Sequence, residues 1–408
     1  MVEINNFHYY NCTMKKILLI IATTLLLVSC TDKQTKKEIE THASATSLNE
    51  NYVKPLIKQN NDKIDSFISS LSLEQKISQL FIENLEGCTS FRSYETIGEV
   101  NGSDDDTPLI AGGYLFFGYN IADTKEDQIA FNNSIRDYSL KYNQIPPFLA
   151  VDQEGGWVSR LRKLSPALPS NEDVANKSTV SEAYDIYKEQ AITMKDLGFH
   201  MNLAPVIEVV TEDNKDFLDG RGFGDATKVL NYGRACVNAY ENNGIATVVK
   251  HFPGNTNTDP HVGLPIITLS KEKLEETLKP FIEVLDYNPE AVLMSHAITQ
   301  AVDNGVPACL SHVWVTDILR NKIGYDGIIF SDDIFMGALA LNGYGPEKAA
   351  VMAIEAGIDC IMISEKRFAK AAKILYKKAL EDSVFMDRIN ESVKRIISYK
   401  VNNGIITL

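Results

Sequence analysis

The sequence lacks two features that would assign it to common binding classes. It has no cluster of basic residues beyond Lys15-Lys16 near its N-terminus, and its formal net charge is −14 over 408 residues. A chain this acidic is poorly suited to nucleic acid or to anionic surfaces. No G-x-G-x-x-G follows its first candidate strand, and this glycine pattern is the mark of dinucleotide-binding domains. We therefore expect no nucleic-acid partner and no cofactor.

The sequence also lacks an apolar run that would comfortably span a bilayer. The run from Ile17 to Val28 follows Lys15-Lys16 and has the length of a signal-peptide core instead. It ends in Leu27-Val28-Ser29-Cys30, which resembles the lipobox of bacterial lipoproteins, whose cysteine receives lipid after cleavage. The resemblance implies lipidation at Cys30 and contact with the membrane through that anchor only. The alternative is a buried strand that ends in a core cysteine.

This reading divides the chain into three segments. Met14 is the expected start, so residues 1–30 combine an over-called extension with a lipoprotein signal peptide. Residues 31–61 are polar and without a sustained period, and we expect a flexible tether there. Residues 62–408 form the predicted folded domain. Because Thr31 supplies no acidic inner-membrane retention signal, we expect a lipid-anchored protein of the cell envelope, at the outer membrane or a periplasm-facing membrane surface.

Few cysteines remain once Cys12 and Cys30 are assigned to the N-terminal segment. Three of the others, Cys236, Cys309 and Cys360, lie in apolar contexts that are typical of buried thiols. The spacing of the cysteines matches no metal site. We therefore expect core thiols and no metal centre.

Short apolar runs alternate with longer amphipathic segments through the predicted domain. The eight candidate strands are Leu80–Ile82, Gly113–Phe117, Phe148–Val151, His200–Ala204, Ile245–Val249, Ala291–Met294, Gly327–Phe330 and Asp359–Ile363. The helical segments between most of them are Lys125–Tyr142, Glu182–Leu197, Val229–Asn242, Lys271–Leu285, Thr316–Lys322 and Pro346–Ala356. Eight strands separated by helices predict an α/β fold, a single (β/α)8 TIM-type barrel. A doubly wound open sheet is the alternative.

Polar residues gather where four of these strands end. The strand ends read Asp152-Gln153-Glu154, Lys250-His251, Ser295-His296 and Ser331-Asp332-Asp333. Active sites of such barrels lie at the carboxyl ends of the strands, and core packing does not account for four polar clusters at equivalent positions. We therefore expect the functional site at this end of the barrel.

The loop after Lys250-His251 carries a further pair of ionisable residues. Pro260 favours an extended conformation at Asp259, and in an extended segment the side chains of Asp259 and His261 point the same way. A carboxylate on one imidazole nitrogen fixes the tautomer, and the other nitrogen can then donate and accept a proton near neutral pH. The spacing thus favours an acid–base pair, and a capped turn with a surface histidine is the alternative.

Taken together, these motifs resemble the barrel-only branch of glycoside hydrolase family 3, the β-N-acetylglucosaminidases. The family's strand-five motif reads Lys-His-Phe-Pro-Gly-His-Gly, four variable residues, then Asp-Ser-His, and Lys250–Gly254, Asp259 and His261 match it. Other matches are Asp152-Gln-Glu-Gly-Gly156, Arg221-Gly-Phe-Gly224, Met294-Ser-His-Ala297, Pro307-Ala-Cys-Leu-Ser311, Ser331-Asp-Asp-Ile-Phe-Met336 and the tail Arg388–Arg395. The resemblance extends from about residue 65 to 405.

The resemblance implies a retaining mechanism and a role for each matched residue. The nucleophile maps to Asp332, the acid/base to His261, and the carboxylate that orients this histidine to Asp259. The residues that map to the substrate-binding positions are Asp152, Arg221, Lys250, His251, Asn255 and His296.

The sequence departs from the family pattern at the same site. The strand-five loop is two residues shorter, with Asn255-Thr256 where His-Gly is expected, and Pro260 replaces a serine. Trp157 replaces the usual arginine, and its ring can stack on a sugar or pack internally. Because positional changes of about an ångström alter rates on the order of a hundredfold, this loop matters most for activity.

The function that the resemblance implies is an exported lipoprotein glycosidase of the β-N-acetylhexosaminidase type. Its glycan partner is expected to carry terminal β-linked N-acetylglucosamine, as in peptidoglycan fragments or chitin-like oligosaccharides. Three alternatives stay open: a non-catalytic glycan-binding lipoprotein, a β-glucosidase of the same family, and a phosphorylase, in which phosphate takes the place of water.

Overall fold

Residues 61–408 of the computed structural model form a closed barrel of eight parallel strands. The strands are hydrogen-bonded in the order β13-β11-β9-β8-β5-β4-β1-β14, and a parallel bridge from Phe330 to Cys360 links the two ends. This closure confirms the predicted barrel and excludes an open sheet. The expected signal segment, the tether and Cys30 lie outside the described residues. Between residues 61 and 408, no helix has the length and apolar character needed to cross a membrane.

Each of the eight predicted strands is present, within one or two residues at most ends. Their bounds are β1 Phe81–Asn84, β4 Gly113–Phe116, β5 Phe148–Val151, β8 Met201–Asn202, β9 Ala246–Phe252, β11 Ala291–Met294, β13 Ile328–Phe330 and β14 Ile361–Ile363. Every residue of these strands is buried, because the barrel interior covers one face and the helices cover the other. This double burial explains why the strands read as continuous apolar runs.

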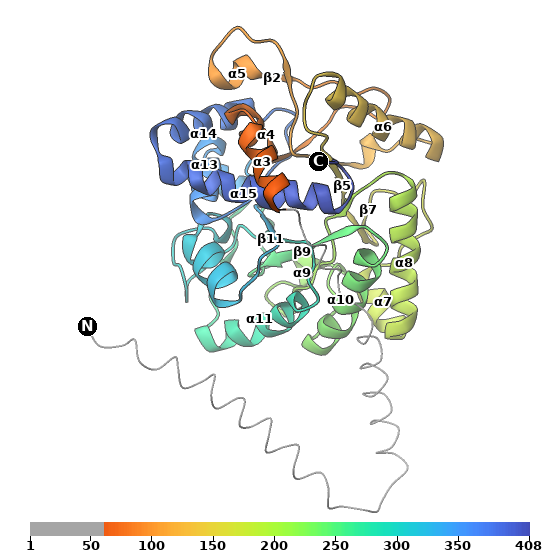
Figure 1. The fold of residues 1–408 in the computed structure, drawn as a ribbon. Helices are drawn as coiled ribbons and strands as arrows, with labels where there is room; N and C mark the ends of the chain where they lie inside the picture. Colours follow the sequence, from red (N-terminus) through yellow and green to blue (C-terminus); the bar gives the residue numbers. More distant parts are fainter. Residues whose placement is uncertain (1–60) are drawn as a thin grey trace, which may run out of the picture. The chain divides into compact units, whose positions relative to one another are not determined.

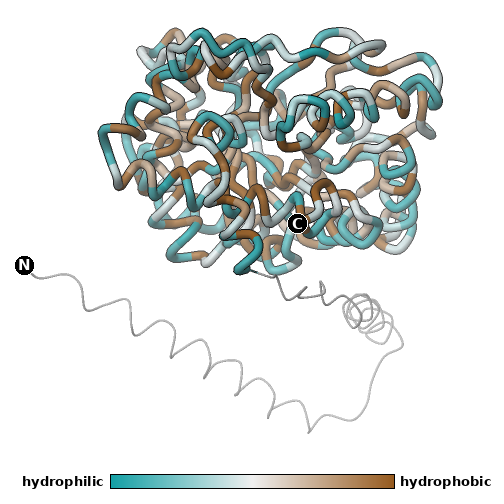
Figure 2. Tube along the Cα trace, turned by 45° about the horizontal axis from the view of Figure 1, so that its top comes forward, coloured by the Kyte–Doolittle hydropathy of each residue, from teal (hydrophilic) through white to brown (hydrophobic). Residues whose placement is uncertain are grey.

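Helices surround the barrel (Figure 1). The main ones are α3 Asn61–Ser70, α4 Leu73–Gln79, α6 Lys125–Lys141, α8 Val180–Asp196, α10 Ala226–Glu241, α11 Lys271–Leu285, η4 Val313–Lys322, α13 Pro346–Ala356, α14 Ala369–Glu381 and α15 Ser383–Asn402. Figure 2 shows hydrophobic and hydrophilic positions alternating along these outer turns, as expected for amphipathic helices. Among these helices, η4 is a π-helix and the others are α-helices. It begins at Val313, three residues before the predicted start at Thr316.

The buried cysteines match their expected role. Cys236, Cys309 and Cys360 are buried free thiols, and Cys88 is a partly buried one. Burial raises the pKa of each of the three buried thiols well above its ordinary value, so they remain protonated and unreactive.

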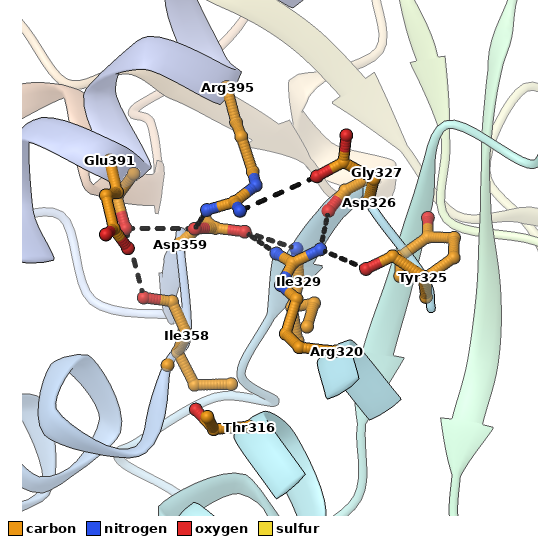
Figure 3. Close-up of polar contacts among 12 residues, drawn as sticks. Thr316, Arg320, Tyr325, Asp326, Gly327, Ile329, Ile358, Asp359, Glu391 and Arg395 are labelled. Atoms are coloured by element: carbon orange, nitrogen blue, oxygen red, sulfur yellow. Dashed lines mark hydrogen bonds and ion pairs between the residues drawn. The ribbon is translucent and has the colours of Figure 1, made fainter. Parts of the chain in front are cut away.

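A network of ion pairs centred on Asp359 lies where β13 and β14 meet and close the barrel. Asp359, two residues before β14, is fully buried and accepts hydrogen bonds from Arg320 of η4 and from Arg388 and Arg395 of α15. Figure 3 shows Arg320 and Arg395 converging on this carboxylate. Asp359 also accepts the backbone N–H of Ile329 in β13 at 3.0 Å. One side chain therefore joins two strands and two outer helices.

We expect Asp359→Asn to lower the free energy of unfolding by about 3–5 kcal/mol, because the change leaves several buried guanidinium groups without their anion. Thermal and urea unfolding measure the loss. Asp326→Asn is the matched control, since the Asp326 side chain is 95% exposed and its Oδ1 lies 3.6 Å from Arg395 Nη2, a long and weak ion pair. Equal stability of the Asp359 variant and this control would contradict the assigned role.

Candidate active site

The polar residues that follow the strands meet at one mouth of the barrel. Asp152 comes directly after β5, Lys250 and His251 are among the last three residues of β9, and Asp332 comes two residues after β13. The strands run parallel around the barrel, so their carboxyl ends lie at the same mouth. The strand ends thus bring together residues that are up to 180 positions apart in the chain.

Four charged side chains form a buried cluster at this mouth. Lys250 Nζ lies 2.8 Å from Asp152 Oδ1 and 2.6 Å from Glu154 Oε1. Arg221 binds Glu154 through two bonds, Nε to Oε2 at 2.8 Å and Nη2 to Oε1 at 3.0 Å. The side chains of Asp152 and Arg221 are 15% and 18% exposed, whereas those of Lys250 and Glu154 are 5% and 1% exposed. Asp152 and Arg221 are therefore open to a ligand, and the buried Lys250 and Glu154 hold them in place through ion pairs.

Glu154 stays ionised despite its burial. Burial alone raises the pKa of this carboxyl, but the charges of Arg221 and Lys250 outweigh it and hold the pKa well below the ordinary range. For Arg221 the desolvation lowers the pKa, and the attraction of Glu154 more than compensates, so the guanidinium remains charged. Glu154 and Arg221 thus form a fixed pair of full charges, which can hold the polar groups of a ligand without rearranging.

A second carboxylate, Glu208, organises the root of the loop after β9. Its Oε1 lies 2.6 Å from His251 Nδ1, and its Oε2 accepts the backbone N–H of Asn255 at 2.6 Å. Asn255 also donates its Nδ2 to Glu208 Oε1 at 3.1 Å. His251 and Asn255 are therefore held by the protein through a common partner, and the bond to Nδ1 leaves His251 Nε2 as the nitrogen that can face a ligand.

Asp332 has the environment of an ionised carboxylate. Burial alone raises its pKa, but the attraction of His296, His251 and Lys250, together with the N–H of Asp333, lowers the pKa below its ordinary value. Its Oδ1 accepts that N–H at 2.9 Å. The side chain is oriented and negatively charged at neutral pH.

His296 and Asp333 lie behind Asp332. The ring of His296 is fully buried, with Nε2 3.0 Å from the carbonyl oxygen of Asp333 and Nδ1 3.2 Å from Cys309 Sγ. Because protein atoms engage both nitrogens, His296 supports the Asp332-Asp333 turn in this arrangement. Asp333 accepts the N–H groups of Phe335 and Ser364, and burial raises the pKa of its carboxyl.

The predicted contact between Asp259 and His261 is formed, but within a turn that Asp259 caps and not in the extended segment that was expected. The carbonyl oxygen of Asp259 accepts the backbone N–H groups of Val262 and Gly263 at 3.1 and 2.9 Å. His261 Nδ1 lies 2.6 Å from Asp259 Oδ1, and the same oxygen accepts the His261 backbone N–H at 2.9 Å. Burial opposes ionisation of Asp259, but the bonds to His261 and the charge of Arg221 lower its pKa. The side chain of His261 is 65% exposed and that of Asp259 is 51% exposed, so the imidazole is open to a ligand on the side away from Asp259.

Two features of this site were not predicted. Glu154 was noticed only as part of Asp152-Gln153-Glu154, and Glu208 was not singled out at all. An isolated acid in the apolar stretch Ala204–Val210 was the signal that could have revealed it, since a buried acid requires a partner.

Trp157 lies between β6 Gln153–Gly155 and β7 Val158–Ser159 and is 76% exposed, which excludes internal packing.

We expect Glu154→Gln to weaken substrate binding and to lower stability. The amide cannot neutralise Lys250 and Arg221, so the two cations repel each other and move away from Asp152. KM should rise about 10- to 100-fold, in line with other supporting contacts, and the melting temperature should fall. Glu189→Gln, on the exposed face of α8, is the matched control. An unchanged KM would show that the cluster does not position a binding residue.

No group of three His, Cys, Asp or Glu side chains between residues 61 and 408 is arranged to hold a metal ion.

Known proteins with this architecture point to one family. The model of the glycosyl hydrolase family 3 N-terminal domain matches residues 72–399. Beta-hexosaminidase A of Pseudoalteromonas piscicida is 27% identical over 320 residues, which cover 71% of this chain and 53% of that protein. An uncharacterised secreted glycosyl hydrolase of Arthroderma benhamiae is 30% identical over 302 residues, with 70% and 83% covered.

A solved structure gives the same result. The family 3 β-N-acetylglucosaminidase of Paenibacillus sp. superposes with a TM-score of 0.74 at 28% identity, covering 83% of this chain and 65% of that one. The chain thus spans about half the length of the Pseudoalteromonas enzyme and about two thirds of the Paenibacillus one. From the extent of these matches and the closed barrel, the chain belongs to glycosyl hydrolase family 3.

Proposed function

We propose that this chain is a retaining β-N-acetylhexosaminidase that removes terminal β-linked N-acetylglucosamine from glycans. The observation that carries the proposal is the Asp259–His261 pair, joined at 2.6 Å, on the loop that follows Lys250 and His251. Such a pair supplies proton transfer, and the ionised Asp332 at the same mouth supplies a nucleophile. The similarity to the Pseudoalteromonas beta-hexosaminidase and to the Paenibacillus β-N-acetylglucosaminidase supports the same reaction.

The reaction needs two steps. In the first, Asp332 attacks the anomeric carbon while His261 Nε2–H protonates the departing glycosidic oxygen, which yields a covalent glycosyl-enzyme and neutral imidazole. In the second, the neutral imidazole takes a proton from water as the water displaces Asp332. Asp259 holds the proton on Nδ1 and stabilises the imidazolium, so the histidine performs both roles.

The charged cluster would bind the terminal sugar. Asp152 and Arg221 are open to the mouth, so they can accept and donate hydrogen bonds to its hydroxyl groups. Lys250 holds Asp152, and Glu154 holds Arg221, which fixes the geometry before substrate arrives. His251 Nε2 offers a further contact, with Glu208 behind it.

We also propose that the protein is exported and held at the cell envelope by lipid on Cys30. The support is the apolar run Ile17 to Val28 that ends in Leu27-Val28-Ser29-Cys30, and the secreted relative from Arthroderma benhamiae. Peptidoglycan fragments and chitin-like oligosaccharides are the substrates that such a location favours. Labelling with a radioactive fatty acid in the native host tests the anchor, and Cys30→Ala should abolish the label.

The direct test of the proposed function is release of 4-nitrophenol from its β-N-acetylglucosaminide by the purified domain. The β-glucoside serves as the competing substrate, and each assay is run with and without phosphate. Preference for the glucoside, or a sugar phosphate as the product, would replace the proposal with one of the related activities. Saturable binding of the sugar without any turnover would instead indicate a binding protein.

A further inference from the structure

The acid–base loop, residues 253–265 between β9 and β10 (Ile266–Ile267), carries both members of the proposed pair. Because the ring partner of His261 is Asp259 on the same loop, the pair can move as a unit. Their mutual bond therefore does not set the distance from His261 to Asp332. That distance depends on the contacts that join the loop to the rest of the barrel.

One such contact is made by Asn257, in the middle of the loop. Its backbone N–H donates to Asp213 O at 2.6 Å, and its side-chain Nδ2 donates to Glu212 O at 2.9 Å. Its Oδ1 accepts the N–H groups of Asp216 and Phe217, at 2.8 and 3.4 Å. Asn257 thus makes hydrogen bonds to four residues of the segment after β8, three of them through its exposed side-chain amide. This segment also leads into Arg221.

A second contact joins the loop to the segment that follows Asp332. The N–H of Gly337 donates to His261 O at 3.2 Å, and the N–H of Ala338 donates to Pro260 O at 2.9 Å. The two chains approach so closely that a Cβ on Gly337 would lie 2.5 Å from His261 O. Gly337 begins the short helix α12 (Gly337–Ala340), only five residues after Asp332.

We propose that Asn257 and Gly337 are positioning residues that clamp the acid–base loop from two sides and so set the place of His261 over the scissile bond. The inference rests on the proposed function, since it assumes that His261 is the acid. Asn257 ties the loop to the segment of the charged cluster, and Gly337 permits its close approach to the segment of the nucleophile. The loop is two residues shorter than the family pattern, and these two contacts hold it in a defined position.

The clamp predicts a dependence on the leaving group. A misplaced acid slows departure of a poor leaving group, while a good leaving group departs without protonation. For Asn257→Ala, kcat/KM on phenyl β-N-acetylglucosaminide should fall about 10- to 100-fold, as expected for a displacement of about an ångström. On the 2,4-dinitrophenyl glycoside it should change less than about threefold. Asn257→Asp keeps the acceptor and should lie between Asn257→Ala and the wild type.

Gly337→Ala gives an independent test, because its methyl group would push the His261 backbone away without altering any polar side chain. It should show the same pattern as Asn257→Ala. Asn403→Ala is the matched control, since it removes an amide that donates to Tyr399 O at the end of α15. Melting temperatures are measured for all variants, and His261→Ala provides the reference for complete loss of the acid.

The outcomes separate the inference from the proposed function. If His261→Ala shows strong leaving-group dependence but Asn257→Ala and Gly337→Ala lose nothing, or lose the same factor on both glycosides, the clamp is wrong and the acid assignment stands. If His261→Ala itself shows no such dependence, both fall. If one of the two variants, Asn257→Ala or Gly337→Ala, does not fold, the kinetics of the other variant test the clamp.

Discussion

Asp332→Asn should reduce kcat on 4-nitrophenyl β-N-acetylglucosaminide by roughly 10⁴- to 10⁶-fold, the loss seen when a covalent nucleophile is removed. An amide oxygen is a much weaker nucleophile than a carboxylate. The pKa of Asp332 is lowered by His296, His251 and Lys250 despite its burial, so the wild-type group is charged over the neutral pH range. Steady-state kinetics on the purified variant measure the effect.

Binding of free N-acetylglucosamine should survive this substitution, because Asp152 and Arg221 are untouched. Calorimetric titration of the variant therefore separates loss of chemistry from loss of the site. Asp326→Asn, an exposed carboxylate exchanged in the same way, is the control. Activity of the Asp332 variant close to that of the wild type would rule out Asp332 as the nucleophile.

His261→Ala should have the second-largest effect, and its size should depend on the substrate. With a poor leaving group such as phenol, kcat/KM should fall about 10²- to 10⁴-fold, the range that a general acid contributes. With 2,4-dinitrophenol, formation of the glycosyl-enzyme should be nearly unaffected, and its hydrolysis becomes the slow step. Kinetics on aryl glycosides of increasing phenol acidity measure this dependence.

Azide provides the complementary readout for the same variant. As a nucleophile that needs no base, azide should react with the glycosyl-enzyme and raise kcat on the dinitrophenyl glycoside, with β-glycosyl azide as the product. Azide should not accelerate the wild type. A uniform loss on all glycosides, with no response to azide, would show that His261 is not the acid/base.

The fold could be predicted from sequence because its signals are local. A strand such as Phe148–Val151 is covered on both faces, so its residues form a continuous apolar run that is visible without any partner. Ser72 and Gln75 form a capping box at the start of α4, and the two residues are only three positions apart in the sequence. Eight such strands with helices between them favour a barrel over an open sheet, and the bridge from Phe330 to Cys360 shows the closure itself.

The candidate site could be predicted only in part, because its contacts join distant segments. Asp259 and His261 were paired correctly because they are neighbours in sequence, although a turn and not the expected extended stretch brings them together. Glu208 is 43 residues from its partner His251, and nothing in the sequence specifies that pairing. The same holds for Arg221 and Glu154, whose bidentate bond depends on how two loops lie over the barrel mouth.

The most direct test of the account is to identify the covalent intermediate. The His261→Ala variant, mixed with the 2,4-dinitrophenyl glycoside and stopped with acid, should carry one N-acetylglucosaminyl group, because its first step is fast and its second is slow. Digestion and mass spectrometry should place that group on the peptide that contains Asp332. An adduct on a different residue, or dinitrophenol release that never leaves an adduct, would contradict the account.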